Sequence, residues 1–509
     1  MKKLIILIIV LCSITAIHAQ GIADALRYSK ENQQGTARFQ AMSGAFGALG
    51  GDFSAINVNP AGAAVFVNNQ VGFTLSTSTI KNNSNYFETV TSTNNSNFDL
   101  NQAGAVFVFN DYNPKNDWKK LVLSINYENV NNLNNSLFSS GKNPNNSIDQ
   151  YFLWYANPNP KIGQGGIFLG TLQNSRYEDL NYKDQQAFLG YNGYIINPDN
   201  PSDVDNDTYK TNVPSGNGFN HQNYIESTGY NGKLNFNIAT QYKDKFYFGL
   251  NLNSHFTDFR QSTRFYENNS NSTNAGVRSI RFDNDLYTYG SGFSFQLGAI
   301  AKITNEFRAG LTYQSPTWYR LFDELQQTLT TTGYNYGNPP NPNLSTTTPD
   351  SNVIIAYQPY HLRTSGKWTG SLAYVFGKKG LISLDYALKD YSNIKFTPKN
   401  EYQDANDNLS NTLSTAGELR IGAEYRIKQW SLRGGFRNEQ SPYKNGSTTG
   451  DLTGFSSGLG YNFGNTKLDL AYSYAQRNSQ NSFFSQGFTD AANIRTKNNN
   501  IVMTLLFEL

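Results

Sequence analysis

Basic side chains on the predicted strands carry the clearest chemistry in this sequence. Four of them share the polar faces of two strands: Arg363, Lys367, Arg433 and Arg437. A guanidinium can hold a carboxylate through two parallel hydrogen bonds, so these side chains are candidates to bind the acidic end of a ligand. Structural pairing is the alternative for each of them, and the acidic residues with suitable parity are Asp385, Glu424 and Asp469.

Histidine and cysteine are too scarce for most catalytic or metal chemistry. The one cysteine, Cys12, lies in an N-terminal segment that we expect to be removed. The three histidines beyond it, His221, His255 and His361, stand in no Ser/His or metal-spaced motif. No glycine-rich phosphate loop occurs between a strand and a helix. We therefore expect no enzyme, no metal site and no cofactor.

The first 19 residues have the features of a secretory signal peptide. Lys2 and Lys3 precede an apolar run over 4–11, and Ala19 supplies a small residue before Gln20. That run is far shorter than the roughly 20 residues a transmembrane helix needs. Without the two lysines the chain has 39 basic and 38 acidic residues (41 minus 2, against 38), a balance that does not suggest nucleic acid binding.

The composition favours an exported all-β protein. Aromatic residues make up 14% of the chain, with 33 Tyr and 34 Phe, whereas the mean hydropathy is only −0.54. No segment after residue 19 is apolar enough for a transmembrane helix. A membrane β-barrel has this composition because only alternate strand residues face lipid. A secreted all-β protein is the alternative.

Alternation of apolar and polar residues predicts fourteen strands. In one example, Phe246, Phe248 and Leu250 alternate with Tyr247 and Gly249. The fold class expected is a fourteen-stranded antiparallel transmembrane β-barrel. The predicted strands cover 70–80, 101–110, 119–129, 224–242, 245–261, 286–303, 306–319, 357–376, 380–396, 413–427, 430–439, 453–463, 467–477 and 498–509.

Short and long connections alternate along the predicted strands. Five are tight turns, at 243–245, 304–306, 377–379, 428–429 and 464–466. The long ones are 81–100, 130–223, 262–285, 320–356, 397–412, 440–452 and 478–497. Short periplasmic turns and long external loops are typical of outer-membrane barrels, not of β-sandwiches. Because a lipid-facing Arg or Lys at the midplane costs about 2–4 kcal/mol, the basic residues are expected to line the lumen.

Residues 20–64 precede the barrel, which we place at 65–509, and they lack strand alternation. A run of Gly and Ala over 41–51 lets the backbone pass close to other walls, and Asn59-Pro60-Ala61-Gly62 predicts a turn. A flexible linker is the alternative, but Phe46 and Phe53 are too apolar for a solvated tail. Eight strands make a barrel that side chains can fill, whereas 16–18 strands leave an aqueous channel. Fourteen strands lie between these sizes, so we expect this segment to plug a lumen that would otherwise leak.

These residues carry a family resemblance. The stretch 37–52 followed by 59–62 resembles the N-terminal signature of the FadL/TodX family, and Gly310–Pro316 is also similar to it. The resemblance implies outer-membrane transport of long-chain fatty acids or hydrocarbons past an N-terminal hatch. The hatch motif residues it points to are Gly44, Asp52, Asn59, Pro60, Ala61 and Gly62. It also implies a kinked third strand, although no glycine or proline occurs between Lys119 and Gly141.

The long loop 130–223 contains a helical insertion at about 147–192. Its apolar residues, at 151–155 and 188–191, would either capture amphipathic ligands or pack on each other as a cap. We expect a hydrophobic small-molecule ligand whose tail contacts Phe46 and Phe53, in a monomer surrounded by lipid of the bacterial outer membrane. The rival functions are a general diffusion porin, which needs an open lumen, and a haem receptor or hydrolase, which usually depends on histidine.

Overall fold

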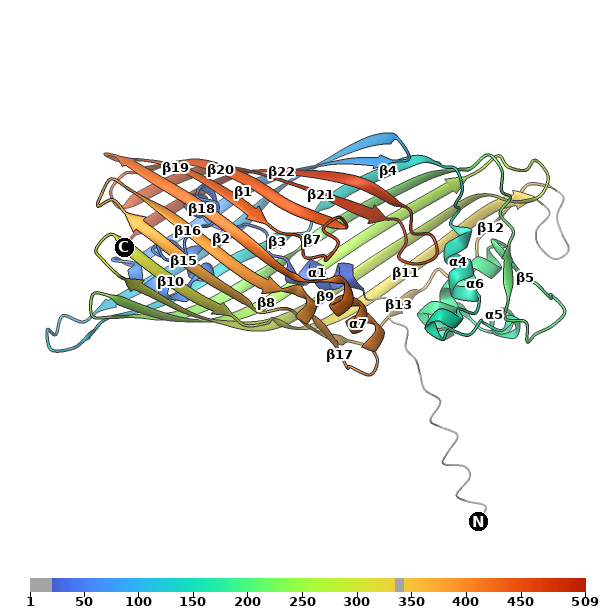
Figure 1. Ribbon diagram of the computed structural model, residues 1–509, viewed down its shortest axis with the longest axis horizontal. Helices are drawn as coiled ribbons and strands as arrows, with labels where there is room; N and C mark the ends of the chain where they lie inside the picture. Colours follow the sequence, from blue (N-terminus) through green and yellow to red (C-terminus); the bar gives the residue numbers. More distant parts are fainter. Residues whose placement is uncertain (1–20, 335–342) are drawn as a thin grey trace, which may run out of the picture.

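Antiparallel pairing continues around the whole sheet and closes it into a cylinder (Figure 1). The computed structural model describes residues 21–334 and 343–509, so the predicted signal peptide lies outside the described residues. β1 (Gln70–Tyr86) pairs with β2 (Thr89–Asn110) on one side and with β22 (Ala491–Glu508) on the other. The cylinder has fourteen strand positions, which confirms the predicted barrel.

Ten of the fourteen positions are single strands. Besides β1, β2 and β22 they are β7 (Phe219–Tyr242), β8 (Phe246–Asn268), β9 (Gly276–Lys302), β18 (Thr415–Ile427), β19 (Trp430–Glu439), β20 (Thr449–Asn462) and β21 (Thr466–Ser482). Each of the other four is interrupted at least once. They are β3 (Trp118–Asn132) with β4 (Asn135–Asn143), β10 (Phe307–Gln314) with β11 (Trp318–Tyr334), β14 (Tyr360–Arg363) with β15 (Lys367–Val375), and β16 (Gly380–Asp390) with β17 (Lys395–Thr397).

Several strands run further than the sequence predicts. The segments 81–100 and 320–356 are expected as loops, but β1 reaches Tyr86, β2 begins at Thr89 and β11 reaches Tyr334. The outer parts of these strands carry polar residues on both faces, such as those at 82–85, so alternation gives no signal there. The backbone ladder continues regardless, because its hydrogen bonds do not depend on side chains.

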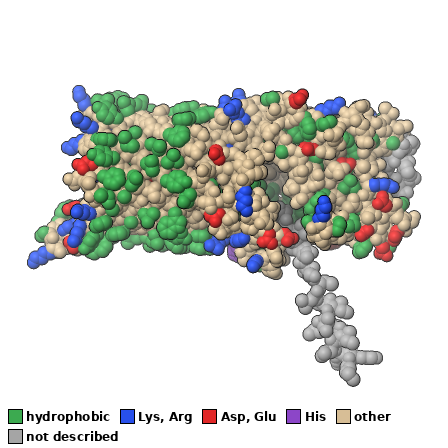
Figure 2. All heavy atoms as spheres, viewed as in Figure 1, with side chains coloured by type: hydrophobic (Ala, Val, Ile, Leu, Met, Phe, Trp, Pro, Cys, Tyr) green, Lys and Arg blue, Asp and Glu red, His purple; other side chains and the backbone are tan. Residues whose placement is uncertain are grey.

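Apolar outward residues are concentrated in one half of the cylinder. On β8 the outward side chains are mainly apolar from Phe246 to Phe256, and then polar from Asp258 to Arg264. A tilted barrel strand crosses a membrane in about 9–11 residues, which matches the apolar stretch. Figure 2 shows the hydrophobic side chains gathered at the end with the short turns. The opposite half of the barrel therefore projects beyond the membrane.

The third strand position is irregular, although its own sequence does not predict this. β2 pairs with β3 only as far as Gln102 and Glu128, and the strand breaks between Asn132 and Asn135. At the break, the Leu133 N–H donates to the carbonyl of Gly229 on β7 (2.9 Å), and Gly229 has a φ of +125°. The resemblance implies a kink in this strand; the interruption seen here lies beside a glycine of the neighbouring strand.

The N-terminal segment lies inside the cylinder, where we call residues 21–65 the hatch. It consists of α1 (Ile22–Ser29), α2 (Ala37–Ala41), α3 (Ala55–Val58) and η1 (Pro60–Val65). α2 contacts β19 to β22, whereas η1 contacts β3 and β7 to β9 on another part of the wall. None of the helices in the described ranges is long and apolar enough to cross a membrane.

Wall glycines bring the hatch backbone close to the strands. A Cβ at Gly249 of β8 would lie 2.3 Å from the carbonyl carbon of Pro60. At Gly310 of β10 it would lie 2.4 Å from the carbonyl oxygen of Gly47, and at Gly435 of β19 it would lie 2.5 Å from the carbonyl carbon of Met42. Real Cβ atoms do not approach other heavy atoms so closely, so the wall requires glycine at these positions.

A helical cap covers the outer end of the barrel. Its helices are α4 (Asp149–Ala156), η2 (Pro160–Ile162), α5 (Leu169–Asn174), η3 (Tyr177–Asp179) and α6 (Tyr182–Asn192), followed by the hairpin β5 (Ile196–Pro198) and β6 (Tyr209–Thr211). β12 (Ser345–Thr347) and β13 (Ile354–Ala356) pair with β11 and continue the wall beyond β14. Smaller elements of the other outer loops are η4 (Tyr391–Asn393) and α7 (Gln403–Thr412).

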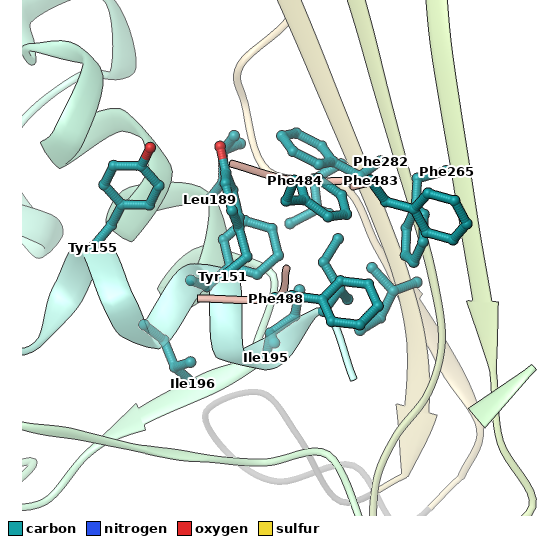
Figure 3. Close-up of a cluster of buried hydrophobic side chains, with 14 of the residues drawn as sticks. Tyr151, Tyr155, Leu189, Ile195, Ile196, Phe265, Phe282, Phe483, Phe484 and Phe488 are labelled. Atoms are coloured by element: carbon teal, nitrogen blue, oxygen red, sulfur yellow. The ribbon is translucent and has the colours of Figure 1, made fainter. Parts of the chain in front are cut away.

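The apolar residues of the insertion are buried within this cap. The ring of Phe484, from the β21–β22 loop, lies 4.7 Å from Tyr151 of α4 and 5.1 Å from Phe265 of β8 (Figure 3). Phe152 and Leu189 are fully buried in the same cluster. These side chains form the core of a cap, and they do not provide the exposed capture surface that was the other expectation.

Candidate functional site

Asn59 and Asp52 of the predicted hatch motif stabilise the fold of the hatch through hydrogen bonds of their side chains. The carboxylate of Asp52 accepts from the hydroxyl of Thr36 (2.8 and 2.9 Å) and from the N–H of Ser54 (2.9 Å). The amide of Asn59 donates to the carbonyls of Gly47 (2.7 Å) and of Ala299 on β9 (3.1 Å). Asn59 therefore joins two parts of the hatch to the wall.

The remaining motif residues shape the turns of the hatch. Gly44 has a φ of +76°, a conformation that favours glycine. Pro60 begins η1, and the Ala61 N–H donates to the Asn59 side chain (3.1 Å). A Cβ at Gly62 would lie 3.0 Å from the Cα of Gly50, so the two segments meet backbone to backbone.

Charged wall residues anchor the hatch from the other side. Glu424 of β18 accepts from Arg38 of α2 at 2.8 Å, and Asp385 of β16 accepts from the N–H groups of Phe46 and Gly47 at 3.0 Å each. The Glu424 carboxylate is fully buried, where such contacts are screened little by solvent. The hatch is therefore held by polar contacts that a local displacement could break and remake.

The four basic candidates have different surroundings. Arg433 donates to Glu424 (2.7 Å) and Asp469 (2.5 Å), so it is a structural ion-pair residue. Lys367 is paired with Glu31 of the hatch at 2.6 Å. Arg437 points into the lumen, and in the described part of the chain its guanidinium makes no hydrogen bond or ion pair within 4 Å.

Arg363 lies on the outer face of the barrel, contrary to the prediction. Its side chain is exposed, whereas Leu362 and Tyr360 point inward and pack with α1. The strand is interrupted at 364–366, between β14 and β15. Because of this interruption, alternation does not continue in step from β14 to β15. Arg363 and Lys367 have the same parity in the sequence, but Arg363 faces outward and Lys367 faces the lumen. His361 is moved outward for the same reason.

A cavity of about 360 Å³ lies between the hatch and the wall at Arg437. Lys30 and Arg477 also line it, so three cations face one space. Of the carboxylates that attract Arg437, Glu418 is paired with Arg420 (2.7 Å) and Glu439 with Arg477 (3.1 Å). Arg437 is 6% exposed, and it is thus a buried cation that is available to an anionic ligand.

The two phenylalanines predicted to contact a ligand do not line this cavity. Phe46 packs on Phe39 (5.6 Å between ring centroids), and Phe53 packs on Phe66 (5.7 Å). Both are buried where the hatch meets the wall. Among the apolar residues that do line the cavity are Ile80, Leu452 and Ala475.

The prediction missed Lys30 and Arg477. Arg477 shares the parity of Asp469 and Ser473 on the predicted strand 467–477, so its inward position could have been found from the alternation. Lys30 directly follows α1, and no pattern in the sequence indicates where that helix lies in the lumen. In residues 21–334 and 343–509 no cluster of His, Cys, Asp and Glu could hold a metal ion.

A second cavity lies on the outer face of the same wall, near the outer ends of its strands. It has a volume of about 940 Å³ and is lined by Asn83, Asp451 and Arg495, among others. Ser479 lines both this cavity and the luminal one. Asn83 and Arg495 are paired in the sheet register and have the outward parity of Thr77 and Ile501, so the second cavity lies mainly on the outer face of the wall, whereas the luminal one lies inside.

Comparisons with known proteins identify one family and several similar solved structures. A family model described as "Outer membrane protein transport protein (OMPP1/FadL/TodX)" matches residues 206–508. No curated protein matches the sequence significantly. A Pseudomonas aeruginosa FadL homologue is 13% identical with a TM-score of 0.51, over 94% of this chain and 99% of that one. The Ralstonia pickettii toluene transporter TbuX (14%, TM-score 0.49, 94% and 99%) and the Pseudomonas putida toluene transporter TodX (12%, 0.48, 94% and 100%) are also similar.

Proposed function

The chain belongs to the OMPP1/FadL/TodX family of outer membrane transport proteins, and from this premise we propose that its cargo is an amphipathic anion with an apolar tail, such as a long-chain fatty acid. The protein is a bacterial outer-membrane barrel and a transporter. What the proposal adds is the chemistry of the cargo and the place where its acidic end binds.

Arg437 is the observation that carries this proposal. A buried guanidinium without a partner is costly, so a protein that keeps one gains from a ligand that neutralises it. A carboxylate fits this group in charge and in geometry, because it can accept two parallel hydrogen bonds. Lys30 and Arg477 add positive charge around the same cavity. A neutral hydrocarbon would leave Arg437 without a paired counter-charge.

The luminal cavity suggests where the cargo is held. The molecule would place its carboxylate on Arg437, with its tail against Ile80 and Leu452. The hatch lies below this site, held by contacts such as Arg38–Glu424. Diffusion past the hatch then requires a local displacement of it rather than an open pore.

A general diffusion porin is not favoured, because the hatch contacts widely separated parts of the inner wall. Liposomes that contain the purified protein should not swell in small sugars. Rapid swelling by the wild-type protein would show an open lumen and would contradict the proposed route.

Oleate binding to the detergent-purified protein tests the role of Arg437. Hydrogen bonds to charged groups contribute about 1.5–3 kcal/mol, so Arg437→Ala should weaken oleate binding about 10- to 100-fold. Arg437→Lys keeps the charge without the paired geometry and should recover part of the affinity. Because Arg437 has no ion pair to lose, the stability of the barrel should not fall.

Arg281→Ala is the matched control, since this exposed arginine pairs with Asp283 on the outer part of β9. It should leave oleate binding unchanged. Equal affinity of the wild-type protein and Arg437→Ala would refute the assignment of the carboxylate site. Failure of the wild-type protein to bind oleate, together with the absence of any acyl species extracted from it, would refute the cargo class.

A further inference from the structure

A groove of about 610 Å³ lies on the outer face of the barrel, across β16, β18 and β19. Ile382, Ala423 and Gly434 are direct neighbours in the sheet register and point outward. Since Ala423 and Gly434 have little or no side chain, the surface is hollow there. The larger side chains of Phe376 and Leu432 border the hollow. The groove belongs to the apolar belt and therefore faces the hydrocarbon of the membrane.

Two lysines stand at the end of this groove. Lys378 and Lys379 form the short turn between β15 and β16, and Lys379 lines the groove itself. Both are exposed, and neither ammonium group has a hydrogen-bond or ion-pair partner among residues 21–334 and 343–509. Short turns of such barrels face the periplasm, so these lysines lie at the headgroup level of the periplasmic leaflet. Figure 2 shows other basic side chains along the same rim.

We infer that this groove is a binding site for one anionic phospholipid of the periplasmic leaflet. The phosphate would contact Lys378 and Lys379, because lysine binds phosphate as a point charge, and one acyl chain would fill the hollow over Ala423 and Gly434. Basic residues beside a membrane-facing hollow are a recognised arrangement for anionic lipids. The inference requires the barrel to lie in the membrane, and it does not depend on the luminal cargo.

Native mass spectrometry of the detergent-purified protein with added phosphatidylglycerol or phosphatidylcholine tests the inference. We expect one phosphatidylglycerol to be retained under conditions that remove phosphatidylcholine. Lys378→Gln with Lys379→Gln should weaken retention about tenfold or more, because each lysine near a charged lipid surface contributes on the order of 1 kcal/mol. The control is Lys243→Gln with Lys245→Gln, which changes another short turn and should retain the lipid.

The hollow itself is tested by filling it. A Cβ at Gly434 would meet only the carbonyl oxygen of Ser456, at 3.9 Å, so Gly434→Leu can fill the groove without strain. It should abolish selective retention of phosphatidylglycerol. Gly370→Leu is the matched control: Gly370 also faces outward, and nothing lies within 4 Å of its Cβ position.

Three results would overturn the inference. The first is equal retention of phosphatidylglycerol and phosphatidylcholine by the wild-type protein. The second is full retention by Gly434→Leu or by the Lys378/Lys379 double variant, each shown to be folded by its heat-modifiable electrophoretic mobility. The third is displacement of the phospholipid by an equal concentration of oleate, which would make the groove part of the cargo route.

Discussion

Replacing Gly435 by alanine should loosen the hatch while leaving the barrel intact. Gly435 faces the lumen, and a Cβ there would lie 2.5 Å from the carbonyl carbon of Met42, 2.6 Å from the nitrogen of Ser43 and 2.7 Å from its hydroxyl oxygen. Two of these atoms belong to the backbone, so a side-chain rotation cannot relieve the contact. The hatch turn at Met42 and Ser43 must move away from the wall.

The magnitude follows from what this movement breaks. Ser456 of β20 holds the turn through three hydrogen bonds: it accepts from the Ser43 N–H (3.1 Å), bonds to the Ser43 hydroxyl (2.8 Å) and donates to the Ala41 carbonyl (2.9 Å). At about 1 kcal/mol each, their loss would cost at most about 3 kcal/mol. Overpacking generally costs about 1–3 kcal/mol, so we expect a loss in this range.

Amide hydrogen exchange of residues 36–66 measures this loss directly. A change of about 1–3 kcal/mol in opening free energy corresponds to about 5- to 150-fold faster exchange, limited to the hatch. Gly434→Ala is the control because Gly434 is the next residue, points outward and has open space around its Cβ position. If both variants accelerated exchange equally, or if Gly435→Ala had no effect, the close approach of hatch and wall would be refuted.

Two further predictions concern the anchoring of the hatch and the cap. Glu424→Gln removes the charge that Arg38, Arg426 and Arg433 share. Breaking buried ion pairs typically costs about 3–5 kcal/mol, so the hatch should loosen and liposomes with this variant should swell in small sugars. Glu508→Gln, at the rim of the barrel, is the control and should not cause swelling. Burial raises the pKa of Asp149 in the cap from 3.8 to about 6, so the folded cap binds this proton more tightly than the unfolded chain does. Its stability should therefore fall as the pH rises from about 4 to about 6. Protease resistance of residues 144–218 should fall over this interval in the wild type but not in Asp149→Asn, and an identical pH profile for both proteins would contradict the assignment.

The sequence predicted the membrane-spanning part of the barrel well, because one face of each strand there must be apolar. Beyond the membrane neither face of a strand must be apolar, so the alternation of apolar and polar residues is lost there. The outer parts of β1, β2 and β11 were therefore expected as loops. The same limit explains Arg363. Parity counting assumes an unbroken strand, and no single residue at 364–366 indicates that the two faces exchange there.

The candidate site could be predicted only in part. The hatch motif is local in sequence, so Asp52 and Asn59 were recognisable, and the parity of Arg433 and Arg437 was correct. Which of the two arginines is paired depends on Glu424 and Asp469, which belong to neighbouring strands. Pairing of this kind is set by strand register, and alternation along a single strand contains no information about register.

The projection of the barrel beyond its apolar belt determines where uptake begins. β9 has 27 residues, about 90 Å of extended chain, whereas a crossing uses about 9–11 residues. A hydrophobic ligand therefore first meets the projecting half of the barrel in water, away from the bilayer. The cap lies on this projecting half, so a detergent micelle around the belt would leave it exposed to water.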